Sequence, residues 1–416
     1  MEEQNTWWTK EKDPHIRNWE ASPVRWIPPI LNDFHLQEPG LHFLTGPRQV
    51  GKTTMLKMMI RNELSKRDPF SVLYYSCDEI LDHRELGEVI DNYLSFRKEK
   101  DIDHSLMVLD EVSFVSGWWR ALKSRLDRGI LSKDIIMVTG SAPMDILGHV
   151  DAFPGRRGTG EDHIMYPLSF SEYCRCIGGL ETERSDLSKV GSNLIKNRVM
   201  EKKLKNLWND YLVSGGFPQP IIDVHSGKGM TRFTSRSFLE GIRGDWAKAG
   251  KKDQYMKQVL RYIIRARGTP VSWNSMSTQT SINSPNTTRS YVELLESTFV
   301  AMVLNLIGAD GRINYKKNRK IHILDPFILR VLSDYVREPV DDGWLLESTV
   351  ASIIGRGNEV NYFRNGTEAD IVMNDVSGQI GFEITKGIKS WKKPWHLKEA
   401  HLLDRDNVHL YMASLN

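Results

Sequence analysis

The segment "TGPRQVGKTT", from Thr45 to Thr54, most constrains how this chain of 416 residues can fold. The apolar stretch "LHFL" precedes it and "TMLKMMIRNEL" follows it, so a strand runs into a glycine loop that opens a helix. Gly46 and Gly51 permit backbone angles that a side chain would forbid, which lets consecutive N–H groups turn toward a phosphate at the positive end of the helix. In this context the pattern predicts a phosphate-binding loop in an α/β fold.

The residues of this loop predict ATP and Mg²⁺ as cofactors. Lys52 is expected to reach the β- and γ-phosphates, and the Thr53 hydroxyl to bind Mg²⁺. The predicted nucleotide-binding residues are Gly46, Pro47, Arg48, Gln49, Val50, Gly51, Lys52, Thr53, Thr54 and Asp110.

Two carboxylates follow a second apolar strand in "SLMVLDEVSF". Asp110 is expected to hold Mg²⁺ together with Thr53, and Glu111 to orient and polarise the attacking water. A protein that only stores ATP does not need the second carboxylate. The pair therefore favours hydrolysis, with Lys52 and Glu111 as catalytic residues.

Two further catalytic candidates follow. In "DIIMVTGSAP", Ser141 ends an apolar strand. If this strand lies between the phosphate-loop strand and the Asp110 strand, Ser141 can hydrogen-bond the attacking water or the γ-phosphate; a helix cap is the alternative. In "FPGRRGTG", Arg156 and Arg157 lie in a glycine-flanked loop. Arg156 can neutralise transition-state charge in a neighbouring subunit or in its own site, and a solvated charge pair is the alternative.

Together "LTGPRQVGKTT", "LDEV", "VTGSA", "GRRG…YPLSFSEY" and "LVSGGFPQPI" resemble the AAA-type P-loop ATPases of archaea and bacteria that carry a C-terminal domain of unknown function. The resemblance implies the nucleotide roles given above, places Ser141 at sensor 1 and matches Arg156 to the family's Gly-Arg. It also implies a doubly wound parallel sheet and makes "GGFP", Gly215 to Pro218, the turn at the domain joint.

Composition bounds the remaining possibilities. The chain has 40% hydrophobic residues, a formal net charge of +3 and a mean hydropathy of −0.42. No stretch approaches the roughly 18 to 20 apolar residues of a membrane span, and the N-terminus lacks a signal-peptide pattern, which predicts a cytoplasmic protein without membrane contact. The three cysteines are expected to be reduced structural thiols. The weakly basic balance permits nucleic-acid contact without requiring it.

Beyond the ATPase core, predicted at 41–178 after a tryptophan-rich prelude at 1–40, we expect a helical lid at 179–250 and a winged helix-turn-helix at 251–320. Its third helix is capped at Ser284 with Pro285 in the first turn. The expected DNA contacts are Asn286, Thr287, Thr288 and Arg289 in the major groove, with Lys316, Lys317, Arg319 and Lys320 on phosphates. A protein-binding module of the same shape is the alternative.

Residues 321–416 resemble a small restriction-endonuclease-like α/β domain, with a Trp-rich helix after the Glu383 strand and a final strand in "NVHLYMAS". The acids Glu347, Asp370 and Glu383 can gather Mg²⁺ in such a fold. Lys386, however, comes one position late for the expected Glu-x-Lys strand, so it should point away from the metal unless a bulge intervenes. A DNA-binding remnant or a protein-docking domain is therefore favoured over an active nuclease. His322 is expected to be a packed core residue.

The sequence thus predicts a Mg²⁺-dependent AAA-type ATPase that couples hydrolysis to DNA binding or remodelling. A nucleotide-gated switch with a protein partner and an ATP-coupled nuclease are the rival hypotheses. Self-assembly into a homo-oligomer is compatible with each of them.

Overall fold

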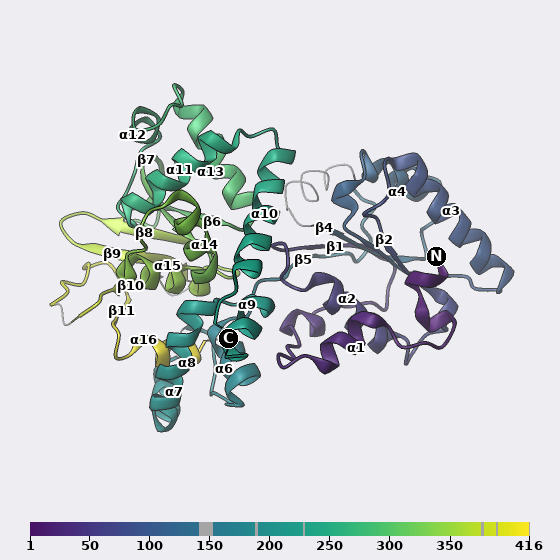
Figure 1. The fold of residues 1–416 in the computed structure, drawn as a ribbon, viewed down its shortest axis with the longest axis horizontal. Helices are drawn as coiled ribbons and strands as arrows, with labels where there is room; N and C mark the ends of the chain where they lie inside the picture. Colours follow the sequence, from purple (N-terminus) through teal and green to yellow (C-terminus); the bar gives the residue numbers. More distant parts are fainter. Residues whose placement is uncertain (141–152, 188–189, 228, 376–377, 388–389, 416) are drawn as a thin grey trace. The chain divides into compact units, whose positions relative to one another are not determined.

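The computed structural model describes residues 1–140, 153–187, 190–227, 229–375, 378–387 and 390–415 (Figure 1). The chain divides into two compact units, an N-terminal unit, Met1–Tyr166, and a C-terminal unit, Pro167–Asn416. Within the described part of the chain, no helix is both long and apolar enough to cross a membrane.

The N-terminal unit is built on a five-stranded sheet. Its strands are β1 (Gly40–Thr45), β2 (Val72–Ser76), β3 (Leu106–Asp110), β4 (Ile135–Gly140) and β5 (Asp162–Ile164), in the order β2-β3-β4-β1-β5. All four neighbouring pairs are parallel. The predicted parallel sheet is confirmed, and β4 lies between the phosphate-loop strand and the Asp110 strand.

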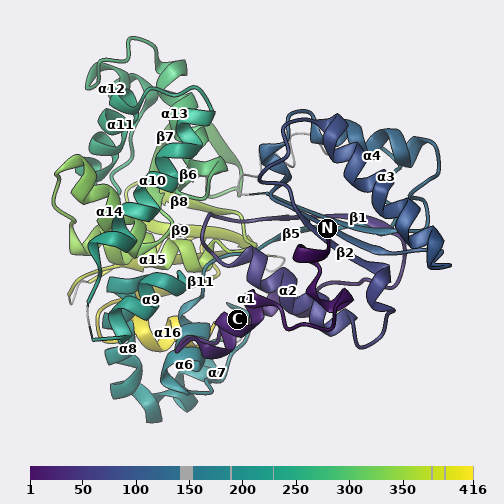
Figure 2. The same cartoon turned by 45° about the vertical axis from the view of Figure 1, so that its right-hand side comes forward.

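Helices cover both faces of this sheet. Figures 1 and 2 show α3 (His83–Glu99) and α4 (Trp118–Asp127) on one face, and α1 (Pro14–Ala21) and α2 (Lys52–Glu63) on the other. The core beneath α3 and α4 joins strand residues such as Phe43 and Leu109 to Tyr93 and Trp118. Covering both faces buries the near-continuous apolar strands, as parallel sheets require.

The first residues of the chain close the outer edge of β2. The Asn5 side chain donates to the Tyr74 carbonyl at 2.9 Å and accepts from the Tyr74 N–H at 2.7 Å, and Gln4 Oε1 accepts from the Ser76 N–H at 2.7 Å. Trp8 packs on Phe96 with ring centroids 4.9 Å apart. The side-chain amides of Asn5 and Gln4 therefore hydrogen-bond N–H and C=O groups of β2 that an exposed edge strand would leave open to pairing with another chain.

The C-terminal unit contains a mixed six-stranded sheet in the order β11-β10-β9-β8-β6-β7. Neighbours pair antiparallel except for β6 with β8 and β10 with β11. The strands are β6 (Ala301–Ile307), β7 (Ile313–Ile323), β8 (Val360–Arg364), β9 (Glu368–Asp375), β10 (Gly378–Ile384) and β11 (Glu399–Leu403). The predicted boundary at 320 falls inside β7.

Eleven helices of the described chain accompany this sheet. They are α6 (Phe170–Gly178), α7 (Val190–Asn197), α8 (Glu201–Ser214), α9 (Pro218–His225), α10 (Arg232–Lys248), α11 (Asp253–Ala266), α12 (Trp273–Thr278), α13 (Pro285–Ser297), α14 (Pro326–Val336), α15 (Asp342–Ile354) and α16 (Val408–Ala413). Two predicted elements are wrong. The segment "NVHLYMAS" contains α16 instead of a strand, because a short, wholly buried apolar run carries no period that separates the two. The Trp-rich segment 390–398 is not helical, and Pro394 interrupts it.

The helices α11, α12 and α13 are followed by the β6–β7 hairpin. Val271, between α11 and α12, exchanges two backbone hydrogen bonds with Arg319 of β7, at 2.9 and 3.0 Å. The hairpin is thereby tied to the helices.

The "GGFP" turn lies inside the C-terminal unit. Gly215 has φ +62°, and a Cβ there would lie 2.1 Å from Asp325 Oδ1, so only glycine fits. The Asp325 carboxylate accepts from the Gly216 N–H at 2.8 Å and from the Phe327 N–H at 2.8 Å at the start of α14. Gly216 in turn accepts from the Leu168 N–H at 2.8 Å. The carboxylate thus joins the Gly216 turn to the start of α14, and the Gly216 carbonyl joins that turn to Leu168.

Candidate functional site

The loop between β1 and α2 has the backbone of a phosphate cradle. Gly46, Gln49 and Gly51 have φ of 156°, 62° and 103°. A Cβ at Gly46 would lie 2.4 Å from the Met165 carbonyl oxygen, so both the backbone angle and the space demand glycine. Gly51 is the N-cap of α2, which places the positive end of the helix dipole at the loop.

The side chain of Lys52 spans this loop. Its ammonium donates to the carbonyl oxygens of Gly46 at 2.9 Å and Pro47 at 3.1 Å, and lies 3.8 Å from Glu111 Oε1. The side chain is almost fully buried. A cation held inside the curve of the loop is placed to neutralise phosphate charge there.

Asp110, only 1% exposed, ends β3 amid three hydroxyl groups. Thr53 and Tyr74 donate to Oδ2 at 2.7 and 2.9 Å, and Thr139 donates to Oδ1. Burial, followed by the Asp110 charge, raises the pKa of Tyr74 above its ordinary value, so the phenol remains a donor. The carboxylate is therefore fixed beside the Thr53 hydroxyl at the N-terminus of α2.

Glu111 turns back toward the same site. Its backbone is left-handed, with φ 55°, and its N–H donates to Thr139 Oγ1 at 3.0 Å. Burial raises the pKa of its carboxyl, and the charge of Lys52 opposes that shift. Among the described residues, Glu111 Oε2 is buried and has no hydrogen-bond partner. A strained backbone and an acceptor of raised basicity fit a group that binds water during a reaction.

These residues fit a magnesium–nucleotide complex. The turned amides and Lys52 suit the phosphates, and the adjacent oxygens of Thr53 and Asp110 are the hard ligands that Mg²⁺ prefers. The sequence interpretation missed Tyr74 and Thr139. Thr139 could have been predicted, because it is a polar residue at the end of an apolar strand, two positions before Ser141. No local sequence feature indicated a role for Tyr74.

Of the other two catalytic candidates, Ser141 lies outside the described residues. Arg156 lies two residues before Gly158, which forms an isolated antiparallel β-bridge with Gly40 at the start of β1. The Arg156 guanidinium pairs with Asp127 at the end of α4. The phosphate loop follows the opposite end of β1. With about 3.3 Å per residue along the strand, Arg156 is remote from the nucleotide site of its own chain. The own-site alternative is therefore wrong for this conformation.

Residues 38–174 match a family model described as an AAA domain. The match covers most of the N-terminal unit, Met1–Tyr166, so this unit resembles an AAA domain. Residues 205–338 match a second family model, a domain of unknown function.

Two curated relatives resemble this chain over most of its length. An uncharacterized protein of Haemophilus influenzae is 24% identical over 68% of this chain and 66% of its own length. An uncharacterized protein of Methanocaldococcus jannaschii is 24% identical over 85% of this chain and 77% of its own length.

Solved structures with a similar arrangement include the Aeropyrum pernix ORC2 protein in its ADPNP–ADP complexes, at 12% identity, with a TM-score of 0.41 and coverage of 79% of this chain and 95% of that chain. Another is Cdc6p from Pyrobaculum aerophilum, at 13% identity, with a TM-score of 0.29 and the same coverages, 79% and 95%. Both TM-scores lie below 0.5.

In the C-terminal unit, two of the three predicted acids, Glu347 and Asp370, lie around a lysine from another element, together with Glu368, which was not predicted. The Lys320 ammonium, on β7, lies 3.0 Å from Glu347 Oε1, 2.6 Å from Asp370 Oδ1 and 3.4 Å from Glu368 Oε1. Its side chain is 3% exposed. Burial alone would lower the pKa of Lys320, but the charges of Glu347 and Asp370 outweigh burial and raise it. The predicted phosphate contact by Lys320 is therefore wrong.

This arrangement does not fit a metal. No group of three or more His, Cys, Asp or Glu in the described residues could hold a metal ion. Lys386 pairs with Asp341, at 3.3 Å, and so lies away from Asp370, in agreement with its late position in the sequence. Glu383 is buried on β10. His322 is fully buried beside Ser348, and burial lowers its pKa to about 3.

The candidate DNA-contacting residues divide into exposed and buried groups. Asn286, Thr287 and Arg289 are exposed at the start of α13, as are Lys316 and Lys317 on β7. Two predictions are wrong. Thr288 is 0% exposed and donates to the Ser284 carbonyl, since it lies on the core side of the helix. Arg319 is buried against the ring of Trp273, with 4.1 Å from Cζ to the centroid.

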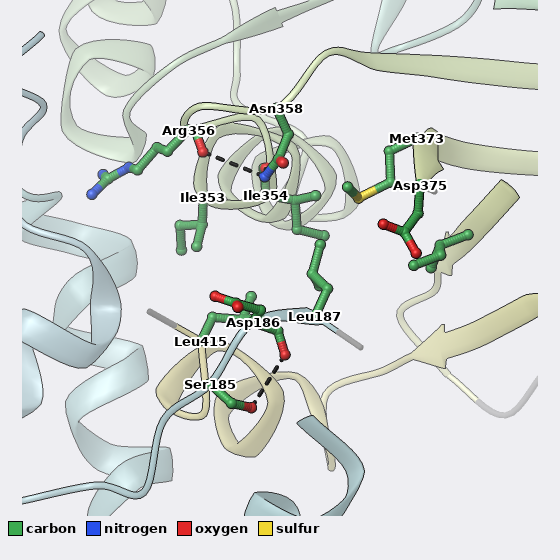
Figure 3. A pocket seen from close by; sticks show the side chains of 11 residues that line it. Ser185, Asp186, Leu187, Ile353, Ile354, Arg356, Asn358, Met373, Asp375 and Leu415 are labelled. Atoms are coloured by element: carbon green, nitrogen blue, oxygen red, sulfur yellow. Dashed lines mark hydrogen bonds between the residues drawn. The ribbon is translucent and has the colours of Figure 1, made fainter. Parts of the chain in front are cut away.

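A cavity of about 480 Å³ lies elsewhere in the C-terminal unit, between the end of α15, strands β9 and β10, and residues 185–187 (Figure 3). Apolar side chains including Ile354 and Met373 line it together with Asp186 and Asp375. Figure 3 shows the guanidinium of Arg356 directed away from Asp375. None of the predicted site residues lines this cavity.

Proposed function

We propose that this AAA protein hydrolyses ATP with Mg²⁺ and uses the nucleotide cycle to act on DNA bound by its C-terminal unit. The observation that carries the ATPase proposal is the pair of neighbouring acids with different surroundings. Asp110 accepts hydrogen bonds from three hydroxyl groups, whereas Glu111 has a buried oxygen without a hydrogen-bond partner among the described residues.

The two acids divide the work. Thr53 and Asp110 would hold the metal, which would neutralise charge on the phosphate oxygens. Lys52 would pair with the phosphates. Glu111 accepts a hydrogen bond from water through Oε2, orienting it for attack on the γ-phosphate, and Thr139 fixes the backbone of Glu111 relative to Asp110.

Turnover and binding of ATP test this division. Glu111→Gln keeps the shape but removes the basic oxygen, so ATP affinity should persist while phosphate release falls by about 10²- to 10⁴-fold. Glu79→Gln, an exposed acid of the same unit, is the matched control. Unchanged phosphate release in the Glu111 variant would refute the role of Glu111, and absence of any nucleotide binding would refute the proposed function.

DNA binding is proposed from the exposed polar start of α13 and from the exposed pair Lys316 and Lys317 on the adjoining hairpin. Replacing both lysines by alanine should reduce the slope of log affinity against log salt by about 1.8 for duplex DNA. The exposed pair Lys202 and Lys203 on α8 is the matched control. If duplex DNA is not retained even at low salt, the protein-partner hypothesis replaces this proposal.

We also propose that Arg156 serves the nucleotide site of a neighbouring subunit, because its place at the far end of β1 excludes its own. DNA cleavage is not proposed, because the Lys320 ammonium lies among the acids that would have to bind the metal.

A further inference from the structure

The segment between β10 and β11 displays one tryptophan among lysines. Residues 386–398, "KGIKSWKKPWHLK", include five lysines and two tryptophans but no acidic residue. Trp395 is 86% exposed, and Lys392, Lys393 and Lys398 are exposed around it. An indole this exposed is unusual, because tryptophan is normally well buried in a folded domain.

This exposure is not the result of a loose segment. The Trp391 indole donates to the Glu368 carbonyl at 2.7 Å, and the Lys398 N–H donates to a β10 carbonyl at 2.9 Å. Leu397 is buried against Gly381, where a Cβ would lie 2.4 Å from Leu397 Cδ1. The backbone is therefore anchored on both sides of residues 392–395, and these anchors hold Trp395 outward.

The segment and the β6–β7 hairpin share one apolar cluster. Leu397 and Trp391 pack there with Ile307, which ends β6, and Ile313, which begins β7. Lys316 and Lys317 follow Ile313 on the same strand. The lysine-rich segment is thus anchored on the cluster that also supports the proposed duplex-binding hairpin.

We propose that residues 390–398 bind single-stranded nucleic acid, with a base stacked on Trp395 and phosphates contacted by Lys392 and Lys393. A flat exposed ring flanked by cations matches the alternation of bases and phosphates, and every base offers a face for stacking. An acidic peptide would satisfy the lysines but would leave the indole without a matching flat partner. The inference deepens the nucleic-acid part of the proposed function and is independent of ATP hydrolysis.

Fluorescence anisotropy with labelled oligothymidine, oligouridine and a DNA duplex tests the proposal on the full chain. Trp395→Ala should weaken single-strand binding about 5- to 150-fold, the usual loss for one stacked base, and Trp395→Phe should retain most of the affinity. Lys392→Ala with Lys393→Ala should reduce the single-strand salt slope by about 1.4. The thymidine and uridine arms show whether DNA or RNA is preferred.

Matched controls separate this site from general electrostatics. Phe233→Ala removes another exposed aromatic ring, which is 81% exposed on α10, and Lys202→Ala with Lys203→Ala removes an exposed lysine pair; both variants should bind like the unmodified protein. The stacking proposal is overturned if the Trp395→Ala variant binds single strands as tightly as the unmodified protein. It is also overturned if only the Lys392→Ala with Lys393→Ala variant loses single-strand binding. If the Lys316 and Lys317 variant alone loses binding to every oligonucleotide, the segment has no role, while the proposed function stands.

Discussion

Replacing Lys320 by methionine should destabilise the C-terminal unit strongly. The substitution keeps most of the aliphatic volume but removes the ammonium that lies 3.0 Å from Glu347 and 2.6 Å from Asp370. Breaking a buried ion pair by removing one partner costs about 3–5 kcal/mol, because the remaining charges stay buried. For a unit of this size, about 2–4 °C per kcal/mol gives a fall of about 6–20 °C in melting temperature.

Calorimetry at two pH values distinguishes this effect from simple loss of packing. Burial raises the pKa of Glu347, and the Lys320 charge that opposes this shift is lost in the variant, so the folded form holds more protons than the unfolded chain and stability rises as the pH falls from 7 to 5. Glu347→Gln added to the variant should restore part of the stability, since it removes one buried charge. Lys386→Met, whose side chain is 42% exposed, is the control and should cost at most about 1 kcal/mol. The reasoning fails if the Lys320→Met and Lys386→Met variants have the same melting temperature at pH 7.

Four further outcomes are expected. Thr139→Val removes the hydroxyl that joins the two acids of the nucleotide site, so phosphate release or Mg²⁺ affinity should fall about 10- to 100-fold. Asn5→Ala leaves the edge of β2 unsatisfied, so thermal stability should fall by about 1–3 kcal/mol and light scattering should rise with concentration. Burial raises the pKa of Asp325 to about 6, above the unfolded value, so stability should fall as the pH rises from about 4 to 6, and Asp325→Asn should remove that dependence in urea titrations. Arg156→Ala should lose at least about 10³-fold in turnover and regain activity when mixed with Glu111→Gln, unless the arginine does not act across subunits.

The nucleotide site was largely predictable because its main parts are contiguous in the sequence. Gly46 to Thr54 form one loop and helix start, and Asp110 and Glu111 end one strand, so each element carries its chemistry locally. The supporting hydroxyls were not predictable in the same way. Tyr74 reaches Asp110 only because β2 and β3 are paired, with Ser76 opposite Asp110. Hydrogen bonds of this kind, between side chains on neighbouring strands, depend on the strand order, which cannot be predicted from a single sequence.

The carboxylate cluster of the C-terminal unit shows a different limit. The acids Glu347 and Asp370 were identified, and Lys386 pairs with Asp341 beyond the end of β10. The sequence nevertheless assigned Lys320 to a DNA surface, because a run of basic residues on a hairpin resembles a phosphate-binding edge. In the structure Lys320 comes from β7, which does not neighbour β9 in the sheet, and its burial follows from the turn of β7 into the core after Asn318. Buried acids require a cation, and the same acids would accept a metal or an ammonium. A metal ion at these acids could support DNA cleavage, whereas an ammonium group can only stabilise the fold. Here the cation is the ammonium of Lys320.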